Sequence, residues 1–502
     1  MASESDYWPR SWALLAAALT AVLVWFGTGL NPWWPLMWLA PLPVQIYATR
    51  SSWRSAALTS AVAWTAGGLN LWHYFTGVLE IPPVIGLAIL IIPSLAFAAT
   101  VLLFRALLRP GAYWIALLAF PAAWVSYEYL LALTSIHGTA GNLSYSQIRF
   151  LPFLQLASVT GPWGMSFLLL LFPVTLAIGL HLRNTAPKLA WRIVFVGLGT
   201  VVLALLFGAA RLQSPAHGER VKVALIASDL PANADVAKQG AESTRLFRDY
   251  LGEVEKLAAS GAKVIVLPEK LGVVVDPDTA VTDAVFQSLA DKTSAKIIVG
   301  MVRVTSLKYN EARIYAPGVP PRTYDKVHML PPFESSLTPG TVLTQLAEPS
   351  GIWGVEICKD MDFTPLSRQY GLAGTGLLLV PAWDFSLDRA LHGHMAIMRG
   401  VESGFSIVRA AKQGYLTVSD NRGRIVAETR SDSSPFSTLV ADVPATHVAT
   451  LYLKLGDWFA WVAMAALLIA LIKLFRLTRE GKHLNMGSRV RSSAKKSGPP
   501  SA

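Results

Sequence analysis

Cys358 is the one thiol in a chain of 502 residues. It follows a short apolar run of strand type, residues 351–355, and precedes Thr364-Pro365, a pattern typical of a helix start. A thiol between a strand end and a helix N-terminus is well placed to be a thiolate, because the helix dipole favours an anion. A lone cysteine is more often a buried structural residue. The charged residues on both sides of this one suit a cleft better than a core, so we predict that Cys358 is a nucleophile.

Two other predicted strand ends carry groups that complete a nucleophilic site. Glu269 directly follows the apolar run 263–268, and Lys326 precedes a proline-rich segment. In an α/β sheet, reactive groups collect where the carboxyl ends of strands open onto loops. A carboxylate can take the proton of a thiol, and an amine can stabilise both the thiolate and the oxyanion of a tetrahedral intermediate. Each residue alone reads as a solvated loop residue, but the three together predict covalent catalysis.

The segment that carries these residues alternates strand-like and helix-like patterns. We expect strands at 221–226, 263–268, 296–304, 351–355, 377–381, 405–410, 415–419 and 424–428, and helices at 242–260, 279–292 and 388–403. This mixture of βα units and late hairpins predicts an α/β domain with stacked sheets. We place this domain at residues 220–446.

The rest of the chain is too apolar for a soluble protein. Hydrophobic residues make up 53% and charged residues 15%, with a mean hydropathy of +0.43, which points to membrane spans. About eight apolar runs approach the ~20 residues that a membrane helix requires: 12–30, 33–49, 53–76, 83–108, 112–133, 160–182, 190–212 and 456–475. We therefore expect an N-terminal membrane domain of about seven helices (1–212), a C-terminal membrane helix (454–477) and a basic, disordered tail (478–502).

The distribution of Lys and Arg predicts the orientation of these helices. Basic residues lie in every second loop and in the tail, whereas the loops 28–33 and 77–82 contain none and 134–159 contains only Arg149. By the positive-inside rule, both termini face the cytoplasm and the α/β domain lies on the outer face. The net charge of +11 follows from these loops, so we expect a lipid bilayer as partner and no nucleic acid.

Several motifs bear a family resemblance. Leu267-Pro268-Glu269, Tyr324-Asp325-Lys326 with Pro332-Phe333-Glu334, and Glu356-Ile357-Cys358 resemble the Glu-Lys-Cys motifs of the nitrilase superfamily. With seven spans before the domain and one after it, the whole chain resembles the bacterial apolipoprotein N-acyltransferase family. The segments 394–402, 408–411 and 455–459 match as well. The resemblance implies a membrane α-helical bundle joined to an α-β-β-α sandwich, in the bacterial cytoplasmic (inner) membrane.

The resemblance also implies a ping-pong reaction. The acyl donor is a membrane phospholipid, which leaves a thioester on Cys358, and the acceptor is the N-terminal amine of a diacylglyceryl-cysteine lipoprotein. By motif, Glu269 is the general base, Lys326 stabilises the oxyanion, and Glu334 positions Lys326 and assists proton transfer. The backbone N–H of Lys359 is a second candidate oxyanion donor.

Two further positions and two departures concern the substrate. The family's Asp-Ala-Trp-Phe run appears here as Trp383-Asp384-Phe385, and the resemblance implies that Trp383 and Phe385 contact substrate. The family usually has Tyr-Glu after the cysteine, where this chain has Lys359-Asp360. The segment between Glu334 and Cys358 is also shorter than in familiar members, which reduces a mobile lid over the site.

Other readings of the sequence are a divergent amidase or an N-acyltransferase for another amine, an inactive scaffold, and a transporter. The intact Glu269, Lys326 and Cys358 argue against a scaffold, and the scarcity of charges within the spans argues against transport. His392 and His394 do not predict a metal site, because this spacing points two side chains apart on a helix. We expect no metal and no cofactor.

Overall fold

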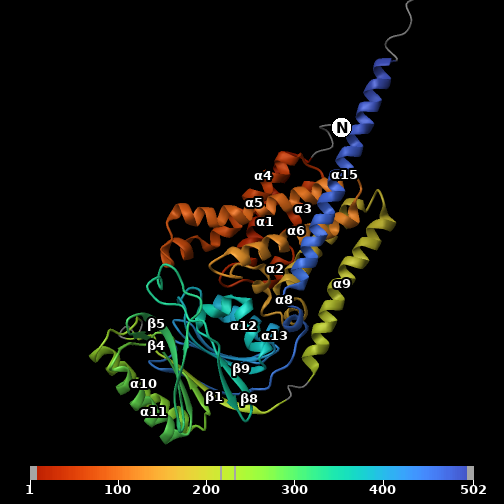
Figure 1. Ribbon diagram of the computed structural model, residues 1–502. Helices are drawn as coiled ribbons and strands as arrows, with labels where there is room; N and C mark the ends of the chain where they lie inside the picture. Colours follow the sequence, from red (N-terminus) through yellow and green to blue (C-terminus); the bar gives the residue numbers. More distant parts are fainter. Residues whose placement is uncertain (1–7, 215–217, 231–232, 234, 495–502) are drawn as a thin grey trace, which may run out of the picture.

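The chain folds into a helical bundle with an α/β sandwich attached to one end (Figure 1). The computed structural model describes residues 8–214, 218–230, 233 and 235–494. We call residues 10–213 the helical part and residues 220–445 the α/β part. The start of the first helix and the end of the last helix lie together, on the side of the bundle away from the α/β part (Figure 1).

Six helices of the described residues are long and apolar enough to cross a membrane. They are α1 (Arg10–Gly27), α5 (Pro83–Leu108), α6 (Tyr113–Thr134), α8 (Ala157–Leu182), α9 (Pro187–Gln213) and the Trp458–Glu480 portion of α15. The expected total of about eight is therefore not confirmed.

The two remaining expected spans are interrupted helices. The run 33–49 forms α2 (Trp34–Met37) and α3 (Leu42–Thr49), because its prolines remove backbone donors inside the run. The run 53–76 forms α4 (Trp53–Gly68), which ends at a pair of glycines, followed by a 3-10 turn (Leu69–Leu71) and a π-helical turn (Tyr74–Val78).

The last helix, α15 (Trp458–Ala494), is longer than the expected span. It continues through residues 478–494, part of the segment expected to be a disordered tail, and the expectation of disorder stays a prediction. Residues 495–502 of the expected tail lie outside the described residues.

Two sheets form the α/β part. The first has the order β13-β1-β2-β4-β5-β6, with β3 beside β4, and the second has the order β12-β11-β10-β9-β8-β7. The strands of the first sheet are β1 (Arg220–Ala227), β2 (Val264–Val266), β3 (Val273–Val275), β4 (Lys296–Val304), β5 (Lys308–Ala316), β6 (Val319–Asp325) and β13 (Ser437–Pro444). The strands of the second are β7 (Thr344–Glu348), β8 (Gly351–Val355), β9 (Thr375–Trp383), β10 (Ser406–Lys412), β11 (Tyr415–Ser419) and β12 (Ile425–Arg430).

Alternating side chains give each sheet two buried faces. Val223 and Leu225 of β1 pack between the sheets, whereas Ala224 and Ile226 pack beneath α10 (Ala241–Ala259) and α11 (Thr279–Thr293). On the far side, α12 (Thr364–Leu372) and α13 (Arg389–Ser403) cover the second sheet. The layers are therefore helix, sheet, sheet and helix, which confirms the expected sandwich (Figure 1).

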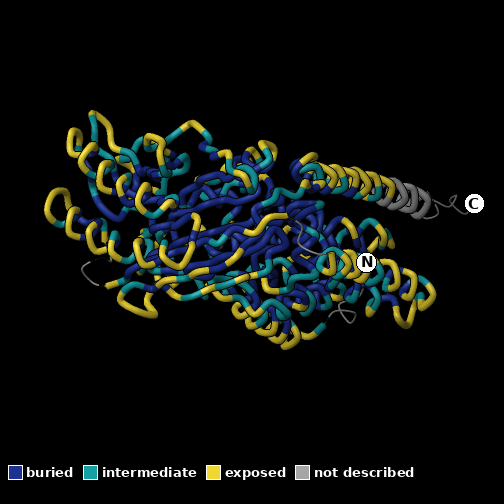
Figure 2. The backbone as a smooth tube through the Cα atoms, turned by 90° about the horizontal axis from the view of Figure 1, so that it is seen from below, coloured by how far each residue is buried: buried dark blue, intermediate teal, exposed yellow. Residues whose placement is uncertain are grey.

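Helix α13 is shared by the two parts. Ala396 packs with Leu378 and Val380 of the second sheet. Met395, Ile397, Met398 and Val401 belong to the same apolar cluster as the buried residues of the helical part. In Figure 2 the buried residues form a band through the middle of the molecule, whereas α15 is largely exposed beyond it. The α/β part thus rests on the bundle through an apolar interface.

Candidate active site

Glu269 lies where the two sheets meet. It follows β2, and its backbone N–H donates to the carbonyl of Ala382 at 3.2 Å, which links the first sheet to β9 of the second. Strand β4 passes directly beneath it at Gly300, where an added Cβ would lie 2.5 Å from the Cα of Glu269. Its carboxylate is buried, with 1% of the residue exposed.

Lys326 and Glu334 join Glu269 in one buried ion cluster. The Nζ atom of Lys326 lies 2.8 Å from Glu269 Oε1 and 2.8 Å from Glu334 Oε2. Burial lowers the pKa of Lys326, but the two carboxylates outweigh it and raise that pKa well above its ordinary value. The structure therefore brings together Glu269, Lys326 and Glu334, which the sequence predicted separately. The raised pKa means that Lys326 is an ammonium ion at neutral pH.

Two residues that we did not predict complete this cluster. The Nδ2 atom of Asn310 on β5 donates to Glu269 Oε1 at 2.6 Å and to Glu334 Oε1 at 2.8 Å. Lys270 Nζ lies 2.6 Å from Glu334 Oε1. Burial raises the pKa of Glu334, but Lys326 and Lys270 lower it to about 2, so Glu334 is a carboxylate at neutral pH.

Cys358 follows β8 and begins a five-residue 3-10 turn, Cys358–Asp362. Its φ angle is 44°, in the left-handed region that a residue with a Cβ seldom adopts. The half-buried thiol donates to the carbonyl oxygen of Trp383 at the end of β9, at an Sγ···O distance of 3.3 Å. The strained turn therefore presents the thiol at the same sheet edge as Glu269.

The expectation of a resting thiolate is wrong. The predicted helix does begin at Thr364, as α12, but Cys358 lies on its own short turn six residues earlier, and a helix dipole acts within about one turn. Burial raises the pKa of the thiol well above its ordinary value, Glu269 raises it further, and Lys326 only partly opposes them. The resting thiol is therefore protonated at neutral pH.

Asp360, one of the departures from the family pattern, holds the turn in place. Its carboxylate accepts hydrogen bonds from the backbone N–H groups of Ile357, Val327 and His328, at 3.2, 3.2 and 2.8 Å. The hydroxyl of Tyr324 donates to it as well, at 2.7 Å. Asp360 thereby ties the turn that carries Cys358 to the segment that carries Lys326.

The residues predicted to contact substrate lie in different surroundings. The side chain of Lys359 is buried toward the helical part, so only its backbone N–H remains for the predicted role. The centroid of the Trp383 indole lies 5.0 Å from Lys270 Nζ and 3.7 Å from Lys412 Nζ. The ring of Phe385 lies 5.6 Å from that of Phe333, which is 48% exposed.

The two histidines of α13 have separate surroundings. His392 contacts Asp388 at 3.2 Å and Asp362 at 3.6 Å, whereas His394 is buried. Among the described residues, no group of three or more His, Cys, Asp or Glu side chains has the arrangement of a metal site.

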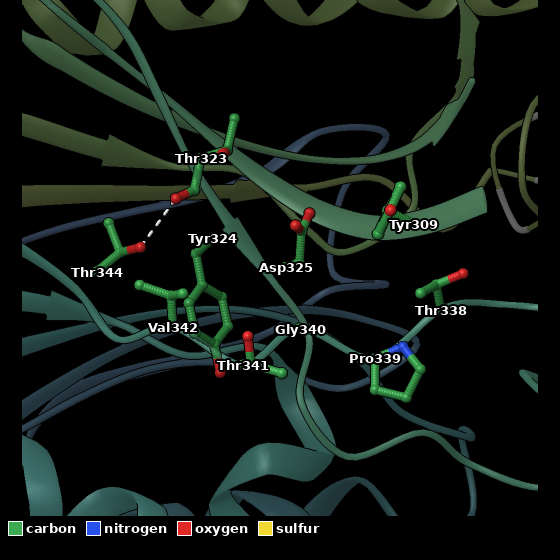
Figure 3. A pocket seen from close by; sticks show the side chains of 10 residues that line it. All are labelled: Tyr309, Thr323, Tyr324, Asp325, Thr338, Pro339, Gly340, Thr341, Val342 and Thr344. Atoms are coloured by element: carbon green, nitrogen blue, oxygen red, sulfur yellow. Dashed lines mark hydrogen bonds between the residues drawn. The ribbon is translucent and has the colours of Figure 1, made fainter. Parts of the chain in front are cut away.

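A cavity separate from the ion cluster lies beside the end of β6. It has a volume of about 450 Å³ and lies between the end of β6 and the segment 338–344. Figure 3 shows Thr323, Asp325 and Tyr309 on the strand side and Thr338–Val342 on the other. None of Glu269, Lys326 and Cys358 lines it, so this cavity does not carry the chemistry.

Comparison with known proteins finds similarity to one family. A family model described as "Apolipoprotein N-acyltransferase N-terminal domain" matches residues 20–175 of the helical part. An apolipoprotein N-acyltransferase of Geobacter metallireducens is 29% identical over 392 residues, which cover 72% of this chain and 74% of the relative. The chain is similar to the apolipoprotein N-acyltransferase family. The relative of Treponema denticola, named Apolipoprotein N-acyltransferase 1, is 23% identical over 428 residues, with 70% and 75% covered.

Two solved structures each match about half of this chain. An amidase from Nesterenkonia sp. matches with 18% identity and a TM-score of 0.39, covering 47% of this chain and 94% of that chain. A Saccharomyces cerevisiae member of branch 10 of the nitrilase superfamily matches with 22% identity and a TM-score of 0.38, covering 46% and 92%.

Proposed function

We propose that this chain transfers an acyl chain from a membrane phospholipid to the N-terminal amine of a diacylglyceryl-cysteine lipoprotein, through a thioester on Cys358. One observation carries the proposal. Lys326 is held between Glu269 and Glu334 beside the sole cysteine of the chain, and that cysteine stands in a strained turn. The names of its relatives support lipoprotein N-acylation as the overall reaction.

In the first half-reaction, Glu269 takes the proton of the Cys358 thiol as the sulfur attacks the ester carbonyl of the phospholipid. The oxyanion is stabilised by the Lys326 ammonium and by the backbone N–H of Lys359, which stands in the first turn of the 3-10 helix and lacks an intrahelical acceptor. Collapse of the tetrahedral intermediate breaks the ester C–O bond. Glu269 returns the proton to the departing glyceryl oxygen, so a lysophospholipid leaves and the thioester remains.

In the second half-reaction, the neutral amine of the lipoprotein attacks the thioester carbonyl. Glu269 accepts the N–H proton while Lys326 again stabilises the oxyanion. The C–S bond breaks, the proton passes from Glu269 to the sulfur, and the amide product leaves. Glu334 remains ionised throughout. Its hydrogen bonds to Lys326 and Asn310 fix the positions of the Lys326 and Glu269 side chains relative to each other.

The lipid nature of both substrates requires the site to face the membrane surface. The start of α1 and the end of α15 lie on the side of the bundle away from the α/β part (Figure 1), which supports placing both termini on the side of the membrane opposite the active site. Phe333 and Phe385, with the exposed Leu387, form an apolar rim near the end of β9. We propose that this rim and Trp383 contact the acyl chain and keep water from the thioester.

The decisive experiment follows the acyl chain. Purified enzyme incubated with phospholipid bearing a labelled acyl chain should gain the mass of that chain at Cys358, and Cys358→Ser should abolish both this adduct and transfer to an acceptor lipopeptide. Labelled product formed by Cys358→Ser at the wild-type rate would falsify the thioester mechanism.

A second acceptor class is favoured by the short segment between Glu334 and Cys358, which lies where the family has a longer lid. In that reading another amine or water accepts the acyl group. Mass spectrometry of lipoprotein N-termini in a strain without this gene distinguishes the two. Loss of N-acylation supports a lipoprotein acceptor, and unchanged N-acylation assigns the enzyme to another one.

A further inference from the structure

The turn that carries Cys358 touches the helical part through a loop more than 200 residues earlier in the chain. Lys359 Nζ lies 3.0 Å from Nδ1 of His137. The carbonyl oxygen of Asp362 accepts hydrogen bonds from the backbone N–H and the hydroxyl of Thr139, at 3.0 and 2.8 Å. Between them, Gly138 has a φ of 53°, and an added Cβ would lie 2.5 Å from that same carbonyl oxygen. The loop 137–139 therefore lies directly against the nucleophile's turn.

The charges at this contact are buried and matched. Lys359 Nζ lies 3.3 Å from Asp362 Oδ2, with 4% and 2% of the two side chains exposed. Burial raises the pKa of Asp362, but Lys359 and His392 lower it to about 2. Burial, and then Lys359, lower the pKa of His137 to about 4. His137 is thus neutral at pH 7, and its Nδ1 can accept from the ammonium of Lys359.

A second chain of contacts leads from the same turn to another loop of the helical part. His392 joins Asp362 to Asp388, at 3.6 and 3.2 Å. The hydroxyl of Tyr74, in the π-helical turn after α4, donates to Asp388 Oδ2 at 2.6 Å. Two separate loops of the helical part therefore contact one polar cluster, and that cluster includes the nucleophile's turn.

We propose that Lys359 is a positioning residue, whose ammonium ties the turn of Cys358 to the helical part and thereby holds the thiol in register with Glu269 and Lys326. The left-handed conformation of Cys358 has to be maintained by its surroundings. Asp360 holds one side of the turn to the end of β6, and Lys359 with Asp362 holds the other side to loop 137–139. The helical part then positions Cys358 for the reaction, in addition to anchoring the enzyme in the membrane.

The sole cysteine gives a direct readout of this role, because alkylation by iodoacetamide reports Cys358 alone. The variants are Lys359→Met, which keeps the length of the side chain and removes its charge, and Lys359→Arg, which keeps the charge. Lys263→Met is the matched control, because Lys263 is exposed on the α/β part. Alkylation and acyl transfer are measured on the full chain in phospholipid nanodiscs.

We expect Lys359→Met to lower kcat for acyl transfer by about 10- to 100-fold, the cost of a misplacement of roughly 1 Å, with KM for the donor little changed. Its alkylation rate and pH profile should also depart from those of wild type. Lys359→Arg should recover a large share of the rate, and Lys263→Met should match wild type. Wild-type kcat and alkylation in folded Lys359→Met would overturn the proposal.

His137→Leu gives an independent test that does not depend on the folding of Lys359→Met. It should lower kcat in the wild-type chain, and its effect should be smaller in the Lys359→Met background, since the two side chains act through one contact. Full activity of His137→Leu, or independent effects of the two substitutions, would contradict the role. The proposal rests on the proposed function for its kcat readout. If wild-type enzyme transfers no acyl chain, that function fails, whereas the alkylation rates still test the positioning role.

Discussion

The sulfur of Cys358 lies 3.3 Å from the carbonyl oxygen of Trp383, at the end of β9. A carbonyl accepts a hydrogen bond and cannot stabilise a thiolate, so this contact fits a protonated nucleophile. The same strand end holds Glu269, whose N–H donates to the carbonyl of Ala382. The end of β9 therefore fixes the positions of the thiol and of its proposed base relative to one another.

The protonated thiol gives the first prediction. We expect Cys358 to react with iodoacetamide at pH 7 about tenfold or more slowly than free cysteine, because each pKa unit above the ordinary value lowers the thiolate fraction about tenfold. The rate should rise with pH beyond 9. Glu269→Gln removes a negative charge beside the thiol, so it should speed alkylation at pH 7 while it slows acyl transfer. A maximal alkylation rate at neutral pH in the wild type would contradict this.

The amide of Asn310 supports the second prediction. Asn310→Leu removes two hydrogen bonds to buried carboxylates, of Glu269 and Glu334. We expect it to lower the free energy of unfolding by about 1–3 kcal/mol and to slow acyl transfer. Chemical unfolding and transfer assays measure the two effects. The exposed Gln239→Leu is the control and should change stability by no more than about 0.5 kcal/mol.

The third prediction concerns two glycines. Gly300→Ala places a Cβ 2.3 Å from the carbonyl oxygen of Pro268 and 2.5 Å from the Cα of Glu269, so the base must move. We expect acyl transfer to fall by about 100-fold. Gly252→Ala, in the exposed middle of α10 where an added Cβ meets no atom within 4 Å, should stabilise the chain by about 1 kcal/mol at unchanged activity. Equal activities of the two variants would show that Glu269 tolerates displacement.

His392 supports a prediction about pH. Burial lowers its pKa, but Asp388 and Asp362 outweigh burial and raise the pKa from 6.5 to about 10. The folded state therefore holds this proton more tightly than the unfolded state, and the resulting stability is complete below pH 6.5 and is lost as the pH rises to about 10. Thermal unfolding of wild type and His392→Gln should differ most near pH 6 and converge toward pH 10. A difference that is constant with pH would show that His392 is not charged in the folded chain.

Much of the site follows from local sequence patterns. Glu269 directly follows an apolar strand, and Lys326 and Cys358 stand just past strand ends, so the α/β topology collects them at one edge. The predicted strands and helices of the βα units match β1, β4, β9, α10, α11 and α13 closely, because their apolar periodicity is strong.

What the sequence could not predict depends on distant segments. Asn310 lies on β5, where the buried Glu311 and Arg313 pair with each other, so charged residues stand at positions that the sequence alone would place at the surface. Lys359 beside the nucleophile suggested a substrate contact, but its side chain is buried by a loop more than 200 residues away. The thiol's pKa depends on burial and on Glu269, which outweigh the local helix signal.

The pairing of β1 with both β2 and β13 has a consequence for biosynthesis. Strand β1 is the first strand of the α/β part to be made, yet its second edge stays open until residues 437–444 have been synthesised. At ribosomal rates this interval is roughly 10 to 40 s. During that time an apolar strand with unpaired N–H and carbonyl groups is exposed to other chains, so a chaperone that covers β1 on the side of the membrane where the α/β part folds would raise the yield of this enzyme.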